Sequence, residues 1–223
     1  DLAGLSAVDG CACCGGTAFA LHGAFGGRVV AVEADAARAE LLAANLALLC
    51  PDGRAAAVTG DFCALWPSLA PTDTVLLDVP WGGPQYGERE TIASLELGGV
   101  EIAELLARLA QAGAAKLLAV RLPRNFDTDA LALRLSSTWE GWPFPWDDEL
   151  QQPERPMPFR AELGDSGTLF AVCLCSAAGP GFRLRHLDGL IAALRAWDGE
   201  AGSRHHVAFF DWEARRWVPL SRW

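Results

Sequence analysis

The segment Asp78-Val79-Pro80-Trp81 carries the residues best suited to chemistry on an amine. The exocyclic amine of a planar heterocycle is a poor nucleophile, because its lone pair is delocalised into the ring. A carboxylate and a backbone carbonyl can accept its hydrogens, and a stacked aromatic ring can hold it in line with a methyl donor. Asp78, the backbone near Pro80 and the Trp81 ring supply these groups in order. We therefore expect Asp78, Pro80 and Trp81 to form a catalytic site for amine methylation.

Two acidic residues farther upstream are candidates for binding a nucleoside cofactor. Asp9 precedes a turn that contains Gly15 and Gly16, and their small size lets a ligand approach the backbone where a helix begins. Glu33 ends the next apolar run, where a carboxylate can accept both hydroxyls of a ribose. Asp35 competes for this role, although its position also suits the N-cap of a helix. A glycine turn between strand and helix is common in α/β folds, so a purely structural role remains an alternative for it.

Two further loops hold polar residues that suit a nucleotide. Asp61 follows a weak apolar run and can accept a hydrogen bond from an adenine amino group while Phe62 packs nearby; an ordinary Asp-containing turn is the alternative. The segment Leu122-Pro123-Arg124-Asn125 follows a strong apolar run, and its Arg can pair with a phosphate. A solvated loop arginine explains the second segment equally well.

The elements that must place these residues are alternating strands and helices. Apolar runs predict strands at 5–11, 28–33, 55–59, 74–78, 115–122 and 168–176. Apolar residues at helical spacing predict helices at 17–24, 34–49, 98–111 and 127–136. This alternation predicts an α/β fold with a mostly parallel, doubly wound sheet. All candidate residues follow predicted strands, and ligands of such sheets bind beyond the carboxyl ends of the strands.

The chain is predicted to divide into a main domain, residues 1–179, and a C-terminal extension, residues 180–223. Residues 139–160 are rich in Trp and Pro, which predicts a long irregular loop inserted in the main domain before its last strand. Within the extension, residues 187–197 predict a helix and residues 206–219 predict a hairpin. We expect the extension to form a small α+β appendage.

Composition narrows the functional classes. The net charge of −10 argues against a protein that coats polyanions generally, and 51% hydrophobic residues indicate a folded domain. No apolar run approaches the roughly 20 residues that span a bilayer, so we expect no membrane partner. Seven cysteines, an odd number, fit reduced thiols inside a cell better than a disulfide framework. Cys11, Cys13, Cys14 and His22 lack a second cluster at zinc-ligand spacing, so we expect no metal.

With these motifs in view, the chain resembles the trimethylguanosine synthase family, which methylates the exocyclic amine of the m7G cap on small nuclear and nucleolar RNAs. The resemblance covers residues 6–176 and is most specific in Pro80-Trp81-Gly82-Gly83-Pro84-x-Tyr86 and in Leu122-Pro123-Arg124-Asn125. It implies a Rossmann-like, class I methyltransferase fold that uses S-adenosylmethionine. It also implies that Trp81 stacks on the methylated guanine and that Tyr86, Arg124 and Asn125 lie near the cap.

The same resemblance bears on the cofactor residues. It implies that Asp9, Glu33 and Asp61 occupy cofactor-binding positions and that Gly15 and Gly16 form the cofactor turn, with Phe62 beside the adenine.

Three departures from the family pattern follow from the sequence. Cys13 stands where the family usually has a Gly, so we expect the turn to bend differently or to bind more weakly. Asp78-Val79 replaces Ser-Pro, which is closer to the Asn/Asp-Pro-Pro-aromatic pattern of other amino-methyltransferases. The family's helical extension before the first strand is absent from these residues, and we expect that upstream sequence is missing.

The leading hypothesis is therefore an enzyme that transfers methyl groups to the N2 amine of m7G-capped RNA. We expect it to act as a monomer, and to reside in the nucleus of a eukaryotic cell or otherwise in the cytoplasm. A related N-methyltransferase that acts on guanine or adenine in rRNA, tRNA or DNA is a second hypothesis, which Asp78 favours. A cap-binding scaffold with a decayed methyltransferase fold is the third, motivated by Cys13, Val79 and the absent extension.

Overall fold

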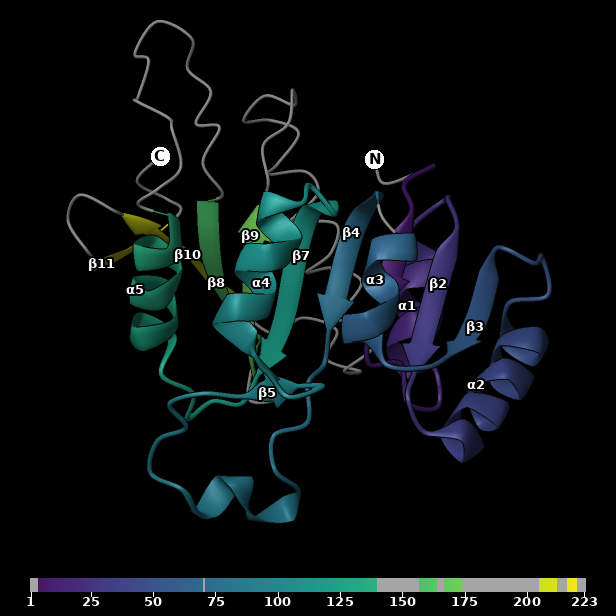
Figure 1. The fold of residues 1–223 in the computed structure, drawn as a ribbon, viewed down its shortest axis with the longest axis horizontal. Helices are drawn as coiled ribbons and strands as arrows, with labels where there is room; N and C mark the ends of the chain where they lie inside the picture. The colour runs from purple at the N-terminus through teal and green to yellow at the C-terminus, as the bar shows by residue number, and fades with distance from the viewer. Residues whose placement is uncertain are drawn as a thin grey trace, which may run out of the picture.

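One large sheet organises the chain in the computed structural model, which describes residues 4–69, 71–139, 157–163, 167–173, 205–211 and 216–219. Five of its strands run parallel: Ala7–Asp9 (β1), Val29–Glu33 (β2), Ala55–Thr59 (β3), Thr72–Leu77 (β4) and Ala115–Leu122 (β7). They lie in the order β3-β2-β1-β4-β7 (Figure 1), which confirms the predicted mostly parallel sheet. The strand order reverses between β1 and β4, and ligands of doubly wound sheets bind at such a switch point.

Four antiparallel strands extend the sheet beyond β7. They are Gly167–Cys173 (β9), Met157–Leu163 (β8), His205–Asp211 (β10) and Arg216–Pro219 (β11), in this spatial order. The sequence predicts that the irregular loop continues to residue 160, and this boundary is wrong: residues 157–160 pair with β9 along the start of β8. The pair β10–β11 lies in the segment predicted as a hairpin and joins the same sheet. Residues 140–156 and the predicted helix at 187–197 lie outside the described residues.

Helices cover both faces of the parallel strands because buried residues alternate between the faces. In β7, Leu117 and Ala119 belong to one core cluster, whereas Leu118 and Val120 belong to the other. The first cluster contains residues of Gly16–Ala24 (α1) and Ala36–Leu49 (α2); the second contains residues of Phe62–Leu69 (α3), Ile102–Gln111 (α4) and Thr128–Trp139 (α5). Figure 1 shows α3 and α4 on the near face of the sheet. Among the residues whose burial the structure describes, the second cluster is the larger, with 22 buried residues.

Capping side chains decide where two helices begin. Asp35 accepts a hydrogen bond from the Arg38 amide and caps α2, the role for which its position in the sequence is also suited. Glu101 accepts hydrogen bonds from two amides of the first turn and caps α4. The helix predicted from Gly98 therefore begins at Ile102 instead. The preceding residues form a small hairpin of Glu96–Leu97 (β5) and Val100–Glu101 (β6).

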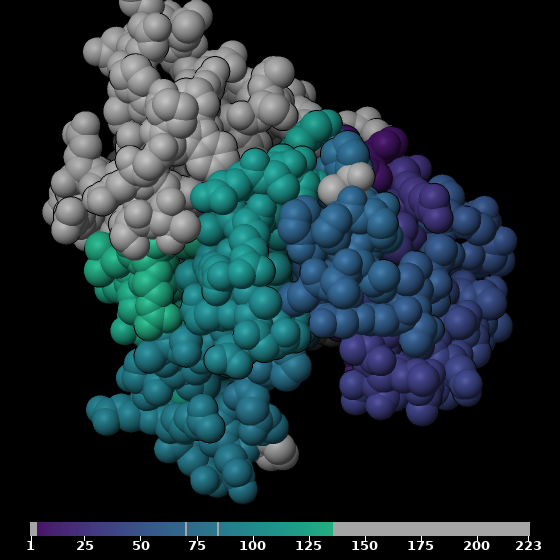
Figure 2. Space-filling model, in the orientation of Figure 1, coloured from purple at the N-terminus to yellow at the C-terminus, as the bar shows by residue number. Residues whose placement is uncertain are grey.

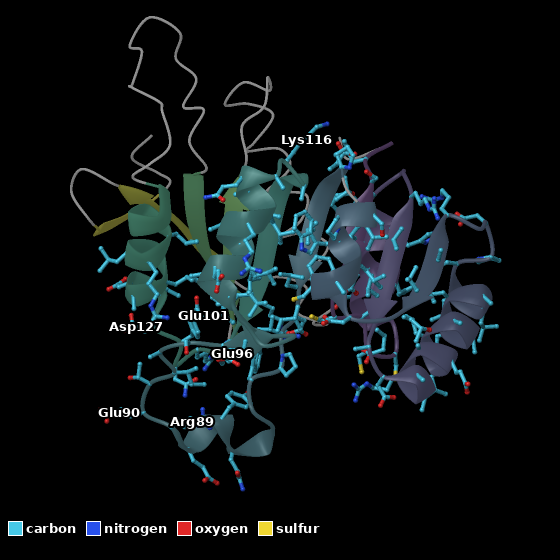
Figure 3. All side chains as sticks on the ribbon, in the orientation of Figure 1. Arg89, Glu90, Glu96, Glu101, Lys116 and Asp127 are labelled. Atoms are coloured by element: carbon cyan, nitrogen blue, oxygen red, sulfur yellow. The ribbon has the colours of Figure 1, made fainter. Side chains whose placement is uncertain are left out.

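A segment between β4 and β5 projects from the carboxyl-end edge of the sheet. It contains the 3₁₀ helix Pro84–Glu88 (η1), and Figure 1 shows it below the arrowheads of the parallel strands. In the space-filling view, the surface is hollowed between this projecting segment and the part of the surface formed by α2 (Figure 2). Figure 3 places Arg89 and Glu90 on the projecting segment and Lys116 at the opposite edge of the sheet. Among the helices that the structure describes, none has the length and apolar character needed to cross a bilayer.

Candidate methyl-transfer site

Acidic side chains from β1, β2 and the end of β4 meet at the switch point. Asp9 ends β1 and is completely buried, and burial is the main reason why its pKa rises to about 7. A hydrogen bond from the backbone amide of Cys11 opposes this rise, whereas the negative charges of Asp78 and Glu33 add to it. Sequence reasoning placed these three carboxylates at strand ends, and the structure brings them close enough to interact electrostatically.

Asp9 also carries an unsatisfied oxygen. Its Oδ1 accepts a hydrogen bond from the Cys11 amide over 3.3 Å, but Oδ2 has no hydrogen-bond partner among the described residues. Buried polar atoms in folded proteins are almost always paired, so an orphaned carboxylate oxygen indicates a group that the protein alone does not provide. A cationic or hydrogen-bonding ligand at the switch point would satisfy it.

The turn after β1 is shaped by small residues and by backbone that bends unusually. A side chain at Gly10 would overlap Leu77 at 2.4 Å, and one at Gly15 would come within 2.9 Å of Leu42. Gly15 has a φ of 101° and precedes α1, which begins at Gly16. Cys13 has a φ of 48°, in the left-handed region that favours glycine, so a cysteine stands here where a glycine would be relaxed.

The carboxylate of Glu33 holds this turn against β2. Its Oε2 accepts a hydrogen bond from the Cys13 amide over 2.9 Å. Its Oε1 accepts from the Asp35 amide and from Arg38, whose guanidinium lies 2.9 Å away. Glu33 is buried, so its charge is balanced by these donors rather than by water. In this arrangement both oxygens are engaged, and a ribose would have to share them or replace a donor.

Asp61 and Phe62 border the same end of the sheet from the β3 side. Asp61 is exposed, and its Oδ1 accepts a hydrogen bond from the Cys63 amide over 2.9 Å. A side chain at Gly98, in the β5–β6 turn, would come within 2.8 Å of this carboxylate, so the hairpin lies directly against it. Phe62 is buried in the core and would lie 2.9 Å from a side chain at Gly10. Phe62 thus supports the turn from behind, and a contact with adenine stays a prediction for both residues.

These features fit S-adenosylmethionine, the cofactor expected from sequence. Its sulfonium and ammonium groups are cationic, and the carboxylates of Asp9, Glu33 and Asp78 gather at the switch point. The orphaned oxygen of Asp9 needs a partner, and the glycines of the turn leave the backbone open to close approach. The cofactor, which supplies an activated methyl group, would be held by Asp9, Glu33, Asp61 and the Gly15-Gly16 turn.

The segment after β4 alternates between core and surface. Asp78 is partly buried, Val79 is 2% exposed and packs in the larger core cluster, and Pro80 is exposed. Val79, which stands where the family pattern has a Pro, is a core residue here. Trp81 is partly buried; its Nε1 donates a hydrogen bond to the Arg121 carbonyl over 3.3 Å. The side chains of Asp78 and Trp81 therefore flank the end of β7.

Arg121 joins these two side chains and was missed by sequence reasoning. Its Nη1 lies 3.4 Å from Asp78 Oδ2, and its guanidinium carbon lies 5.6 Å from the centroid of the Trp81 ring, above that ring. The strand register explains why Arg121 contacts Asp78. Leu77 of β4 pairs with Val120 of β7, so Asp78 and Arg121, which follow them, are neighbours. A charged residue near the carboxyl end of an apolar strand was the available signal in the sequence.

The segment after β7 braces the projecting segment. Asn125 donates one amide hydrogen bond to the Tyr86 carbonyl, at 3.0 Å, and another to the Arg89 carbonyl, at 2.8 Å. The Ile92 amide donates to the Asn125 carbonyl over 2.8 Å. Asn125 therefore acts on the loop backbone, which sequence reasoning did not foresee. Arg124 is exposed beside it, and its contact with a phosphate stays a prediction.

Tyr86 contributes an aromatic wall next to Trp81. The two ring centroids lie 5.0 Å apart at an interplanar angle of 74°, an edge-to-face arrangement that aromatic pairs favour. Because Asn125 fixes the Tyr86 carbonyl, the position of this ring depends on the segment after β7. The structure thus brings Trp81, Tyr86 and Asn125 together, and their contact with a cap stays a prediction.

The cysteines near the turn do not form a metal cluster within the described ranges, where no three His, Cys, Asp or Glu residues are grouped to hold a metal ion. Cys13 and Cys14 are exposed, with their Sγ atoms 4.0 Å apart, and Cys11 is partly buried. Burial raises the pKa of the Cys11 thiol well above its usual range, and the charge of Asp9 adds to the effect. Cys11 is therefore neutral and unreactive at physiological pH.

Comparison with known proteins identifies the family of this chain. The model of the family described as RNA cap guanine-N2 methyltransferase matches residues 5–143, more than half of the chain. A conserved hypothetical protein from Streptococcus pyogenes shares 12% identity at a TM-score of 0.50, covering 78% of this chain and 88% of that one. A putative methyltransferase from Porphyromonas gingivalis W83 shares 17% identity at a TM-score of 0.52, covering 79% of this chain and 38% of that longer one.

At these identities, the two solved structures support the fold alone: a Rossmann-like sheet of the class I methyltransferase type. The family match goes further, because it includes β1 with its turn, the Asp78–Trp81 segment and the segment that contains Arg124 and Asn125. A member of a methyltransferase family with this fold takes its methyl group from S-adenosylmethionine. The chain belongs to the RNA cap guanine-N2 methyltransferase family.

Proposed function

We propose that the chain transfers a methyl group from S-adenosylmethionine to the exocyclic N2 amine of an m7G cap on RNA. The juxtaposition of Asp78 and Trp81 at the switch point is the observation that carries this proposal. Asp78 accepts amine hydrogens and Trp81 offers an aromatic face, and Asp78 lies close enough to Asp9 to interact with it electrostatically. The family description supports the choice of guanine N2. In a eukaryotic cell, small nuclear and nucleolar RNAs would be the substrates and the nucleus the site of action.

Each residue of the acceptor side has a distinct task in this reaction. Asp78 accepts hydrogen bonds from the amine and orients its lone pair, and the backbone near Pro80 accepts the second hydrogen. Trp81 stacks on the positively charged m7G ring, an interaction that a tryptophan provides better than other aromatic residues. Tyr86 bounds the ring, and the exposed Arg124 pairs with the phosphates of the cap in this proposal.

The direct test is a methylation assay with mass detection. Purified protein and S-adenosylmethionine should add 14 mass units to the m7G nucleoside of m7GpppG, whereas GpppG should react far more slowly. Calorimetry with S-adenosylhomocysteine, run alongside, measures cofactor binding independently of the acceptor. Binding of the cofactor product without methylation of m7GpppG would refute the proposed acceptor; no binding at near-millimolar ligand would favour the scaffold hypothesis.

A second acceptor class is favoured by one observation. Asp78 stands where the family usually has a serine, and an acid at this position is typical of enzymes that methylate amines of adenine or guanine within a nucleic acid. Such an enzyme would act on an uncharged base, so it would methylate GpppG, or an unmethylated rRNA or tRNA, at least as well as m7GpppG. The comparison of the two cap analogues therefore separates the two proposals.

A further inference from the structure

The side chain of Arg121 makes both of the contacts that the acceptor base requires. Its guanidinium lies over the Trp81 ring at 5.6 Å from the centroid, and its Nη1 donates to Asp78 Oδ2 at 3.4 Å. About one fifth of the Arg121 side chain and about one quarter of the Asp78 side chain are exposed, so the pair lies in the wall of the site and not on the open surface. The two groups that would select an acceptor are thus already engaged with each other through one arginine.

A guanidinium is chemically close to the reacting edge of guanine. It is a planar carbon bearing N–H donors in a fixed fork, and it stacks on aromatic faces. The N1–C2–N2 edge of guanine has the same arrangement of nitrogens around one carbon. In m7G the ring is also cationic, as the guanidinium is. Arg121 and an m7G ring therefore offer Asp78 and Trp81 the same kinds of interaction.

We propose that Arg121 is an internal surrogate for the acceptor, and that the acceptor base must displace its guanidinium from Asp78 and Trp81 before methyl transfer. This inference rests on the proposed function of the site. Only the side chain needs to move, because the Arg121 carbonyl accepts the Trp81 Nε1–H bond and keeps the backbone in place. Displacement makes Arg121 a specificity-determining residue: a cationic ring brings a positive charge beside Asp78 in place of the guanidinium, whereas an uncharged base brings none.

Substitution of Arg121 by Met tests the displacement. The Met side chain keeps an aliphatic stem but has no donor or charge, so m7GpppG no longer competes with an internal group. We expect its KM to fall about tenfold, the equivalent of one lost cation–π or ionic contact, while kcat changes less than threefold. Arg108→Met is the matched control, because Arg108 pairs with Glu104 on the exposed face of α4; it should leave both constants unchanged. A fall in kcat at unchanged KM would overturn the proposal, since it would mean that Arg121 only orients Asp78.

A small guanidinium ion gives a readout that a merely structural role would not change. Methylguanidinium chloride at about 20 mM, matched with NaCl, should compete with m7GpppG in the Arg121→Met variant and restore a KM close to that of the wild type. It should compete much less in the wild type, in which the Arg121 guanidinium already occupies the site beside Asp78 and Trp81. Equal inhibition of the two proteins would overturn the surrogate role.

The failure of this inference can be told apart from the failure of the proposed function. If the wild type does not methylate m7GpppG, the proposed function fails, and calorimetry with methylguanidinium still tests Arg121. The ion should then bind the Arg121→Met variant and should not bind the Arg121→Met/Trp81→Ala double variant. Absence of binding to the single variant, or equal binding to both, would overturn the surrogate role in that case.

Discussion

The backbone amide of Cys13 donates a hydrogen bond to Glu33 Oε2 over 2.9 Å and thereby fixes the turn after β1 against the end of β2. Among the described residues, two other side chains bond to the backbone of this turn: Asp9 Oδ1 accepts from the Cys11 amide, and Asn45 Nδ2 donates to the Cys14 carbonyl. The carboxylate expected to bind a ribose is therefore also the carboxylate that shapes the cofactor turn. Cofactor binding and turn geometry should change together when Glu33 is altered.

Replacing Glu33 by Gln should weaken cofactor binding. The amide keeps the size of the side chain but removes the charge and one acceptor, so the bonds to the turn and to the ribose hydroxyls both lose strength. We expect the Kd for S-adenosylhomocysteine to rise about 10- to 100-fold, measured by calorimetry. Glu40→Gln, an exposed change on α2, is the control and should have no effect. An unchanged Kd in the Glu33 variant would mean that the ribose binds elsewhere.

Cys13 should be sensitive to the shape of its replacement because its φ is 48°. A β-branched residue is strained in the left-handed region, so Cys13→Val should lower the free energy of unfolding by about 1–2 kcal/mol more than Cys14→Val does. Cys14 is also exposed and does not have a positive φ, which makes it a close control. Urea denaturation measures both variants; equal losses would exclude strain at Cys13.

The parallel strands could be predicted from the sequence because each is a short apolar run whose burial is set locally. β3 and β7 have the predicted bounds, and β1, β2 and β4 differ from theirs by a few residues. β8 could not, because Met157–Leu163 includes Pro158 and two charged residues and owes its conformation to pairing with β9 and β10. Periodicity reports what a segment buries, whereas pairing with distant strands is decided by the whole sheet.

The residues of the candidate site likewise fall into those that the sequence indicates and those that it does not. Asp9, Glu33, Asp78 and Trp81 follow strands, so the sequence alone indicated that they meet at one edge. Arg121 was missed because its contact with Asp78 depends on the register of β4 against β7, which one-dimensional patterns do not contain. The role of Asn125 as a brace was likewise hidden, since it acts on carbonyls 36 and 39 residues away.

Asp9 should make the stability of the protein depend on pH. Its pKa is raised from 3.8 to about 7, so the folded state binds this proton more tightly than the unfolded state does. The contribution of protonated Asp9 to the free energy of unfolding is fully present below pH 4 and is lost as the pH rises through 7. Asp9→Asn mimics the neutral acid at every pH, so its advantage over the wild type should grow from near zero at pH 4 to at most about 4 kcal/mol at pH 8.

Urea denaturation across this pH range measures the difference, with Asp129→Asn in the exposed first turn of α5 as the control. The cofactor should reverse the preference, because a sulfonium favours the ionised carboxylate. We expect S-adenosylmethionine to bind the wild type more tightly as the pH rises through 7, and S-adenosylhomocysteine, which lacks that charge, to depend on pH less. A pH-independent difference between wild type and Asp9→Asn would show that Asp9 does not titrate in this range.

Asn125 should influence the acceptor side without affecting the cofactor. Asn125→Ala removes two hydrogen bonds to the Tyr86 and Arg89 carbonyls, which should cost about 2 kcal/mol of stability and loosen the wall beside Trp81. The KM for m7GpppG should rise about tenfold while the Kd for S-adenosylhomocysteine stays constant. Asn45→Ala gives the crossed control: it removes the bond to the Cys14 carbonyl, so it should weaken cofactor binding and spare the acceptor. The same pattern in both variants would mean that the two loops are not independent.

Trp81 provides the most discriminating test of the acceptor site, because it carries the stacking face, the bond to the Arg121 carbonyl and the contact with Tyr86. Trp81→Ala removes all three, and kcat/KM for m7GpppG should fall at least about 100-fold while S-adenosylhomocysteine binds within threefold of the wild type. Trp81→Phe keeps a ring but loses the Nε1–H donor, so its loss should be about tenfold. Trp66→Phe in α3, away from the acceptor, controls for a general effect of losing an indole. If turnover survives in Trp81→Ala, the m7G ring does not stack on this residue. If cofactor affinity instead falls in parallel with turnover, Trp81 supports the fold of the whole site and does not recognise the acceptor.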